Sequence, residues 1–306
     1  MIIITGQTAT GKTKLALELA KKHNGELINF DSRQIYKYLD IITGKDLPPR
    51  WSSRALRCHC DPDSVGRSNL SVNSVEGSVW LYDIVSPDQY FSSFDFVKQV
   101  MPIIKDVKKR NKTPILVGGT YLYLKHLLYG IDDNNSPPNF KLRDELNNKT
   151  VEELQNILKK LDVQSINRLN NSDRNNPRRL IRKIEIIKSN PKGTGFKRSD
   201  PLRYVPDQFI GIKYKKKEDL VKAIKIRVDK RLKQGAVEEV QSLLKKGYKE
   251  TDPGMKTIGY QEIIQYLKGK ITKKQAIEQW INHEIQYAKR QYTFMKKDKS
   301  IIWKEI

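Results

Sequence analysis

The sequence predicts an α/β protein with a parallel sheet core, a helical insert and a set of C-terminal helices. Three observations lead to this prediction. Short apolar runs alternate with segments of helical periodicity over the first 130 residues. A glycine-rich segment joins the first apolar run to the first helical segment. After Gly130 the chain becomes mainly helical in its periodicity.

The expected strands are short apolar runs that end at glycine or polar residues. They cover residues 1–5, 27–30, 79–85 and 114–117, with a returning strand at 209–214 and a short last one at 300–303. Leu15, Ala16, Leu19 and Ala20 mark one helix face, and further helices are expected from Ser92 to about Arg110 and from Thr120 to about Tyr129. Strands alternating with helices indicate a parallel sheet covered on both faces.

The stretch between Leu47 and Ser78 breaks this pattern. It holds seven serines, scattered arginines and little periodic apolar content, so we expect a long surface loop there. Its Cys58-His59-Cys60 lacks the second ligand pair of a zinc site. Two cysteines in 306 residues exclude a disulfide scaffold.

Beyond Gly130, residues 134–138 have the composition of a linker. Thr150 with Glu153 and Thr272 with Gln275 form two expected capping boxes. Pro177 suits the first turn of a helix through Ile187, and more helices are expected at 218–234, 236–246, 258–268 and 273–297. We therefore divide the chain into a core (1–130), a helical insert (131–205) and C-terminal helices that complete the core (206–306).

Basic residues are concentrated in the second part of the chain. The net charge is +23, and residues 1–130 hold 18 Lys and Arg against 12 Asp and Glu, whereas residues 131–306 hold 40 against 23. Such an excess favours a polyanionic partner, although the lysine usage of an AT-rich genome would also produce it. No apolar run has the length of a membrane span and no leader is recognisable, so we expect a cytoplasmic protein, acting as a monomer.

The glycine-rich segment carries the strongest single signal. Gly6-Gln7-Thr8-Ala9-Thr10-Gly11-Lys12-Thr13 fits G-x-x-x-x-G-K-[ST], the phosphate loop of P-loop NTPase-like folds. Backbone amides around Gly6, Thr8, Ala9, Thr10 and Gly11 would cradle a diphosphate, Lys12 would add a positive charge, and the Thr13 hydroxyl would bind Mg²⁺. The motif predicts diphosphate binding without naming the diphosphate.

A second polar cluster follows the second expected strand. Asp31-Ser32-Arg33-Gln34 comes directly after the apolar run 27–30, so Asp31 should lie at the carboxyl edge of the sheet beside the phosphate loop. A helix cap for residues 32–39 is the simpler alternative. Asp83, at the end of another strand, is the candidate for an acidic Mg²⁺ ligand of the kind that kinases use.

Five motifs, in order, resemble those of the tRNA dimethylallyltransferase (isopentenyl-diphosphate:tRNA transferase) family. Besides the phosphate loop they are Asp31 to Tyr36, Gly118 to Tyr123, Asn176 to Arg182, Ile258 to Glu262 and Tyr287 to Gln291. The resemblance covers about residues 1–46 and 80–297. It implies transfer of the dimethylallyl group from dimethylallyl diphosphate to N6 of the adenosine at tRNA position 37, with Mg²⁺ as cofactor.

The resemblance also implies roles for individual residues. Asp31 matches the general base, Thr120 a threonine near the reacting groups, and Arg227 an arginine that reaches the diphosphate. The implied tRNA contacts, with the anticodon stem-loop, are Asp31, Ser32, Arg33, Gln34, Thr120, Arg143, Arg178, Arg179, Leu180, Ile181, Arg182, Met255, Lys256, Thr257, Ile258, Gly259, Tyr260, Gln261, Glu262, Lys289, Arg290 and Gln291.

Three other functions remain open at this point. An isopentenyltransferase acting on free adenine nucleotides would share the fold, but would not need the basic insert and the C-terminal helices. An ATP-dependent small-molecule phosphotransferase would require Asp83 as its Mg²⁺ ligand. An RNA-binding protein with an inactive phosphate loop is disfavoured, because Lys12, Thr13, Asp31 and Thr120 are all present.

Overall fold

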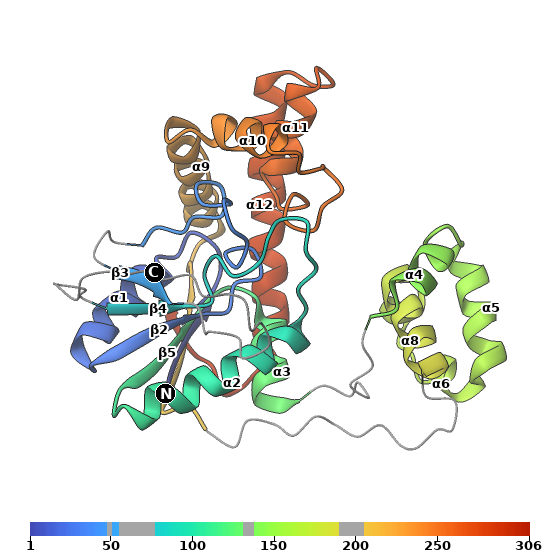
Figure 1. The fold of residues 1–306 in the computed structure, drawn as a ribbon, viewed down its shortest axis with the longest axis horizontal. Coiled ribbons are helices and arrows are strands. Elements are labelled where there is room, and N and C mark those ends of the chain that lie inside the picture. Colours follow the sequence, from blue (N-terminus) through green and yellow to red (C-terminus); the bar gives the residue numbers. More distant parts are fainter. Residues whose placement is uncertain (48–50, 55–76, 131–137, 190–204) are drawn as a thin grey trace, which may run out of the picture. The chain divides into compact units, whose positions relative to one another are not determined.

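The computed structural model of the chain describes residues 1–47, 51–54, 77–130, 138–189 and 205–306 (Figure 1). The chain forms two compact units: a core unit, Met1–Leu124 with Tyr204–Ile306, and an insert unit, Lys125–Arg203. The expected linker at 134–137 and the Cys58-His59-Cys60 segment lie outside the described residues.

The core unit is built on a parallel sheet of seven strands in the described residues, in the order β3-β4-β2-β5-β1-β6-β7. The strands are β1 (Ile2–Gly6), β2 (Gly25–Asn29), β3 (Trp51–Arg54), β4 (Gly77–Trp80), β5 (Thr113–Val117), β6 (Gln208–Lys213) and β7 (Ile302–Glu305). Every neighbouring pair is parallel. The predicted α/β class and parallel sheet are confirmed.

Strand β3 lies inside the stretch that the sequence predicts to be a surface loop. The prediction is wrong for residues 51–54, which pair with Gly77–Trp80 of β4 at the edge of the sheet. An edge strand needs a ladder on one side only, so Trp-Ser-Ser-Arg forms one without the apolar alternation of a central strand. Residues 48–50 and 55–76 of the stretch are outside the described part.

Both faces of the sheet are covered, which explains the apolar strands. Helix α1 (Lys12–Lys22) covers one face of the sheet. Its Ala16 and Ala20 belong to an apolar cluster that also contains side chains from five strands. Residues of opposite parity such as Ile3 and Leu116 are fully buried as well. Helix α2 (Ser93–Lys109) contacts β5 and has the expected N-cap at Ser92, completed by Asp95 as a capping box; α3 is Tyr121–Tyr129.

Four C-terminal helices gather around a second core of the core unit (Figure 1). They are α9 (Lys217–Lys233), α10 (Ala236–Lys245), α11 (Tyr260–Leu267) and α12 (Lys273–Met295). Trp280 and Tyr260 are among the largest fully buried side chains. The long helix α12 has the predicted capping box at Thr272 and contacts α9, α11 and β1. It thereby brings C-terminal residues against the first strand.

The insert unit is all-helical in its described residues and has its own core. Its helices are α4 (Phe140–Asn147), α5 (Val151–Leu161), α6 (Val163–Asn167), α7 (Asn171–Arg174) and α8 (Pro177–Ser189). The capping box at Thr150 and the helix that begins at Pro177 are as predicted. Leu154, Leu158, Leu180 and Ile184 are at the centre of its apolar cluster. In the described parts of both units, no helix is long and apolar enough to cross a membrane.

Candidate active site

The strand order places three loops at one edge of the sheet. Strands β2, β5 and β1 are adjacent and parallel, so their carboxyl ends meet along the same edge. The phosphate loop follows β1, Gly118-Gly119-Thr120 follows β5, and Asp31 follows β2. This topology brings together the motifs that the sequence analysis singled out.

The phosphate loop depends on glycine at its two ends. Gly6 has φ +138°, and a Cβ there would lie 2.1 Å from the carbonyl oxygen of Ile212. Gly11 has φ +74° and directly precedes α1. Within the loop, Thr10 Oγ1 and Lys12 Nζ both donate to the carbonyl oxygen of Gln7. Thr13 is half-buried in the first turn of α1.

Two cations meet at this loop. The pKa of Lys12 is lowered to about 8, chiefly by burial and also by the nearby guanidinium of Arg227, while Asp31 and Glu284 act in the opposite direction. Arg227 lies on α9, and its Nη2 donates to the carbonyl oxygen of Thr43 at 3.2 Å. The structure therefore brings Arg227 close enough to Lys12 for their charges to interact, as a shared anion site requires.

Thr120, after β5, is hydrogen-bonded to Ser32, the residue that follows Asp31 after β2. The backbone N–H of Ser32 donates to Thr120 Oγ1 at 2.9 Å, and Thr120 Oγ1 donates to Ser32 Oγ at 3.1 Å. Asp31 is half-buried, and its Oδ1 accepts the backbone N–H of Arg33 at 2.9 Å. The alternative that Asp31 caps a helix at 32–39 is wrong, because residues 32–38 form turns and a single β-bridge.

Three further side chains interact electrostatically with Asp31: Tyr82 and Glu284, to which the sequence assigned no role, and Tyr287, the first residue of a C-terminal motif. Burial and the charge of Asp31 raise the pKa values of Tyr82 and Tyr287, and Tyr287 shares a side-chain hydrogen bond with Thr120. Burial also raises the pKa of Glu284, against the opposing influence of Arg227. Glu284 was detectable in principle, since it is a polar residue within the buried stripe of α12.

Thr13 is the residue of this site that could hold a metal ion. In the described ranges, no group of three His, Cys, Asp or Glu could hold one. Mg²⁺ usually keeps several waters and binds few protein groups together with substrate phosphates, which fits a single hydroxyl ligand such as Thr13. Asp83 is the Mg²⁺ ligand that a phosphotransferase would need. In this structure it forms an ion pair with Lys45, whose side chain is almost fully buried.

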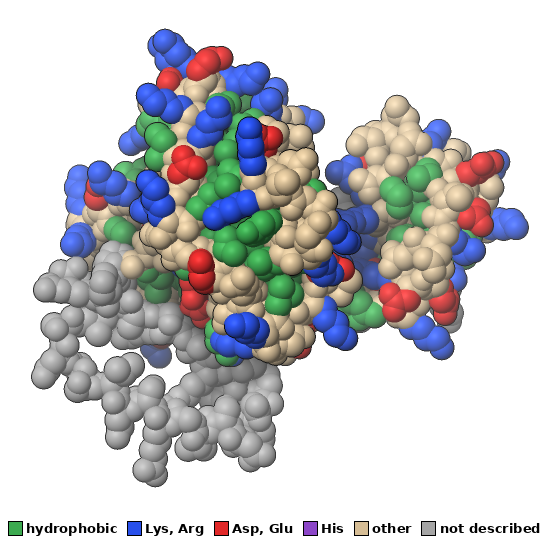
Figure 2. Space-filling view, turned by 90° about the horizontal axis from the view of Figure 1, so that it is seen from above, with side chains coloured by type: hydrophobic (Ala, Val, Ile, Leu, Met, Phe, Trp, Pro, Cys, Tyr) green, Lys and Arg blue, Asp and Glu red, His purple; other side chains and the backbone are tan. Residues whose placement is uncertain are grey.

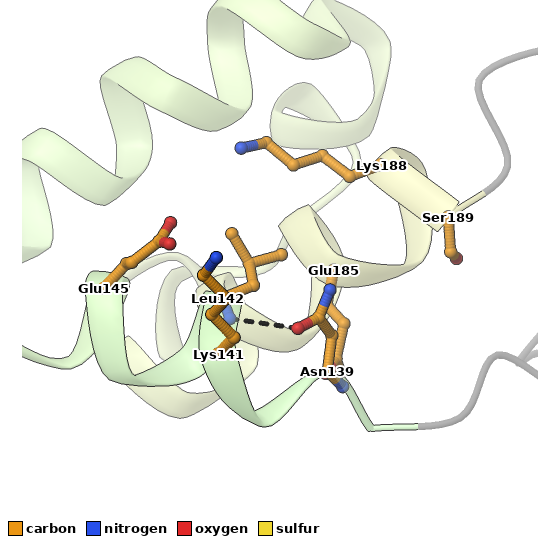
Figure 3. Close-up of a pocket in the computed structure, with 7 residues that line it drawn as sticks. All are labelled: Asn139, Lys141, Leu142, Glu145, Glu185, Lys188 and Ser189. Carbon is orange, nitrogen blue, oxygen red and sulfur yellow. Dashed lines mark hydrogen bonds between the residues drawn. The ribbon is translucent and has the colours of Figure 1, made fainter.

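In the insert unit, two of the implied RNA-binding arginines share a buried carboxylate. Glu185, 1% exposed, accepts Nε and Nη2 of Arg143 at 3.0 and 2.9 Å and Nη1 of Arg182 at 2.5 Å. It also accepts the backbone N–H of Asn139, beside a cavity of about 320 Å³ (Figure 3). These contacts order both guanidinium groups.

The remaining residues of the α8 motif divide by helix face. Arg178 and Arg179 are exposed, with Arg179 paired to Asp173, whereas Leu180 and Ile181 are buried in the core of the insert unit. The side chains of Leu180 and Ile181 are therefore not presented to a partner. Figure 2 shows Lys and Arg side chains scattered over the visible face rather than gathered in one patch.

The C-terminal motifs divide in the same way. Lys256, Lys289 and Arg290 are exposed, and Ile258 and Gln261 are partly so. The other implied contacts are packed inside the core unit: Met255, Thr257, Gly259, Tyr260, Glu262 and Gln291. Near Asp31, Arg33 donates to the carbonyl oxygen of Pro253 at 3.1 Å, and Gln34 donates to those of Thr43 and Gly44.

The fold and the site define an α/β protein in which the glycine-rich loop after β1 and the carboxylate of Asp31 lie at the carboxyl ends of neighbouring parallel strands. Residues 76–298 match the model of the family described as IPP transferase. The chain is 35% identical to the tRNA dimethylallyltransferase of Clostridioides difficile, over 99% of this chain and 90% of that protein. It is 36% identical to that of Endomicrobium trichonymphae, over 97% and 91%. The chain belongs to the IPP transferase family.

Solved structures agree with this assignment. A eukaryotic dimethylallyltransferase acting on tRNA superimposes with a TM-score of 0.75 at 27% identity, covering all of this chain and 73% of that one. The tRNA isopentenylpyrophosphate transferase of Bacillus halodurans superimposes with a TM-score of 0.64 at 29% identity, covering 99% and 89%.

Proposed function

We propose that this protein transfers the dimethylallyl group of dimethylallyl diphosphate to N6 of the adenosine at tRNA position 37, next to the anticodon. The products are N6-isopentenyladenosine and diphosphate. The observation that best supports this function is the common sheet edge, where Lys12 interacts electrostatically with the half-buried carboxylate of Asp31 and with Arg227 of α9. Relatives that share most of their length with this chain carry the name of this activity.

The chemistry requires a base and a stabilised leaving group. The N6–carbon bond forms as the bond between the dimethylallyl carbon and the diphosphate oxygen breaks. Asp31 accepts the proton from N6, because an adenine amino group is a weak nucleophile until that proton is taken up. Lys12 and Arg227 stabilise the negative charge that develops on the departing diphosphate.

Mg²⁺ would bind at Thr13 together with the diphosphate, where it would neutralise part of the leaving-group charge. Thr120 would hold the loop that carries Asp31 through the N–H of Ser32. The adenine must leave the base stack of the anticodon stem-loop to reach a half-buried carboxylate. The exposed cations of α8 and α12, Arg178, Arg179, Lys289 and Arg290, would contact the RNA backbone. We place this reaction in the cytoplasm, catalysed by a monomer.

A transfer assay separates this function from its alternatives. Purified protein is incubated with labelled dimethylallyl diphosphate, Mg²⁺ and either unmodified tRNA with adenosines at 36–38 or AMP. We expect label in the tRNA and none in AMP, and no turnover of ATP in a parallel assay. Label in AMP without label in tRNA would contradict the proposal, and ATP turnover dependent on Asp83 would favour a phosphotransferase.

A further inference from the structure

Gln291 of α12 is a buried polar side chain of the core unit, and both ends of its amide are hydrogen-bonded. It is 7% exposed, although its motif suggests an RNA contact. Its Oε1 accepts the backbone N–H of Thr8 in the phosphate loop at 2.9 Å, and its Nε2 donates to the carbonyl oxygen of Gly119 at 3.1 Å. Both ends of one amide thus join the loop after β1 to the loop after β5.

Gly119 is shaped to admit this amide. A Cβ on Gly119 would lie 2.3 Å from Gln291 Nε2, a distance at which real atoms collide, and 3.4 Å from Asp31 Oδ2. The Gln291 amide, the Gly119 backbone and the Asp31 carboxylate therefore meet at one point. A movement of the Gln291 amide would therefore shift the Gly119 backbone next to the Asp31 carboxylate.

The neighbouring residues of α12 support the same contact surface. The carbonyl oxygen of Ala288, one turn earlier, accepts Gln7 Nε2 at 3.5 Å, and Met295 Sδ, one turn later, accepts Thr5 Oγ1 at 3.1 Å. Thr5 Oγ1 also lies 3.3 Å from the carbonyl oxygen of Gly118. One buried face of α12 thus follows the end of β1 and the loop after β5, with Gln291 at the centre.

The hydrogen bond from the Thr8 N–H to Gln291 also affects which backbone amides of the phosphate loop remain to bind a diphosphate. In a phosphate loop, the N–H groups point at the anion. The Thr8 N–H donates to Gln291 instead. This hydrogen bond fixes the loop, and the N–H has an acceptor without a bound ligand.

We propose that Gln291 is a positioning residue, which sets the spacing between the phosphate loop and the Gly119-Thr120 segment. It thereby holds the departing diphosphate in register with Asp31. The inference rests on the proposed function for what occupies the site. It differs from an RNA contact, because the side chain is buried and both of its polar ends are engaged by the protein.

The test replaces Gln291 by Met, which keeps the length of the side chain and removes both hydrogen bonds. The matched control is the same substitution at Gln286, an exposed residue of the same helix. Three quantities are compared: the affinity for inorganic diphosphate with Mg²⁺, kcat for transfer, and KM for tRNA. Direct diphosphate binding needs no transfer reaction, so it tests the inference even if wild-type protein fails to modify tRNA.

For Gln291→Met we expect diphosphate affinity to fall about 10-fold and kcat about 10- to 100-fold, because small misplacements of reacting groups have large rate effects. KM for tRNA and all values of Gln286→Met should stay within about twofold of wild type. An unchanged diphosphate affinity and kcat, or a raised KM for tRNA alone, would overturn the proposal.

Should Gln291→Met not fold, Gln291→Glu provides the same test. Glutamate still accepts the Thr8 N–H but cannot donate to Gly119. We expect it to fold, with reduced diphosphate affinity and kcat and an unchanged KM for tRNA. Wild-type diphosphate affinity and kcat in this variant would overturn the proposal as well.

Discussion

The hydroxyl of Thr120 accepts the backbone N–H of Ser32 at 2.9 Å, and this bond ties the loop after β5 to the residue that follows Asp31. The two residues are 88 positions apart in the chain. Strand order explains the contact, since β2 and β5 are neighbours and both loops leave the same edge. The position of the proposed base thus depends on a side chain from the loop that follows another strand.

Thr120→Val should remove this anchor while preserving shape. The Ser32 N–H would lose its acceptor, at a cost of about 1–2 kcal/mol in the free energy of unfolding, and kcat should fall about 10- to 100-fold. Thr120→Ser keeps the hydroxyl, so its activity should stay within a few-fold of wild type. Thermal unfolding and single-turnover transfer to tRNA measure both effects; a loss in Thr120→Ser with none in Thr120→Val would show that the methyl group, not the hydroxyl, matters.

Asp31→Asn should abolish most transfer without unfolding the protein. The amide oxygen can still accept the N–H of Arg33, so the turn is retained, but asparagine cannot take up the N6 proton. General bases contribute about 10²- to 10⁴-fold to rate, and a loss of that order in kcat is expected. Asp88→Asn, an exposed change elsewhere, is the control. Full activity of Asp31→Asn would remove Asp31 from the role of base, while leaving the rest of the site intact.

Lys12 should give diphosphate binding an alkaline limit. Its ammonium has a pKa of about 8 in the ligand-free protein, so it loses its proton, and its attraction for an anion, as the pH rises above that value. The affinity for dimethylallyl diphosphate, measured by calorimetry from pH 6.5 to 9.5, should weaken above about pH 8. In Lys12→Arg the guanidinium stays charged, so the loss of affinity above about pH 8 should disappear, even if binding is weaker at every pH. If the affinity of Lys12→Arg still falls above about pH 8, the titrating group is not Lys12.

The same lysine affects stability in the opposite sense. The unfolded chain holds the Lys12 proton up to its ordinary pKa of 10.5, whereas the folded protein releases it at about 8. Between these values the unfolded state binds more protons, so the contribution of Lys12 to the free energy of unfolding rises with pH. Lysine at this position therefore lowers stability at neutral pH in return for a charge at the diphosphate site.

Local patterns were enough to predict the framework of the core unit. The phosphate loop, the strand that precedes it and the cap at Ser92 are each determined within a few residues of sequence. The position of Asp31 beside the loop followed from one general property of parallel sheets, that their carboxyl ends share an edge. Strand β3 escaped prediction because its pairing with β4 is not encoded in its own four residues.

The direction in which each motif residue faces could not be predicted in the same way. Within Tyr287 to Gln291, the structure exposes Lys289 and Arg290 and buries Gln291. Helical periodicity supplies the spacing, but only the contact of α12 with β1 and the phosphate loop shows which face is the inner one. A motif recognised as a unit therefore combines residues with different tasks.

Glu185 should be a stability determinant of the insert unit. Burial by itself raises its pKa, but hydrogen bonds from Arg143 and Arg182 outweigh burial and hold it below the ordinary value of 4.5. Its contribution to the free energy of unfolding is therefore present above pH 4.5 and is lost as the pH falls below that value. Glu185→Gln should cost about 2–4 kcal/mol, because two guanidinium groups lose their shared carboxylate. Hydrogen exchange in α4 and α8 measures this; Glu145→Gln, exposed on α4, should show less than about 0.5 kcal/mol.

Arg178 should contribute to RNA affinity through charge alone. It is exposed on α8, with Leu180 and Ile181 of the same motif turned into the core, so its side chain is available to a phosphate. Arg178→Ala should weaken tRNA binding and lower the slope of log affinity against log salt by about 1, because one fewer counterion is released. Transfer at saturating tRNA should be unchanged. Lys159→Ala, exposed on α5, removes the same charge from another helix of the insert unit. If both variants change the slope equally, the RNA responds to the net charge of the unit, and α8 has no special role.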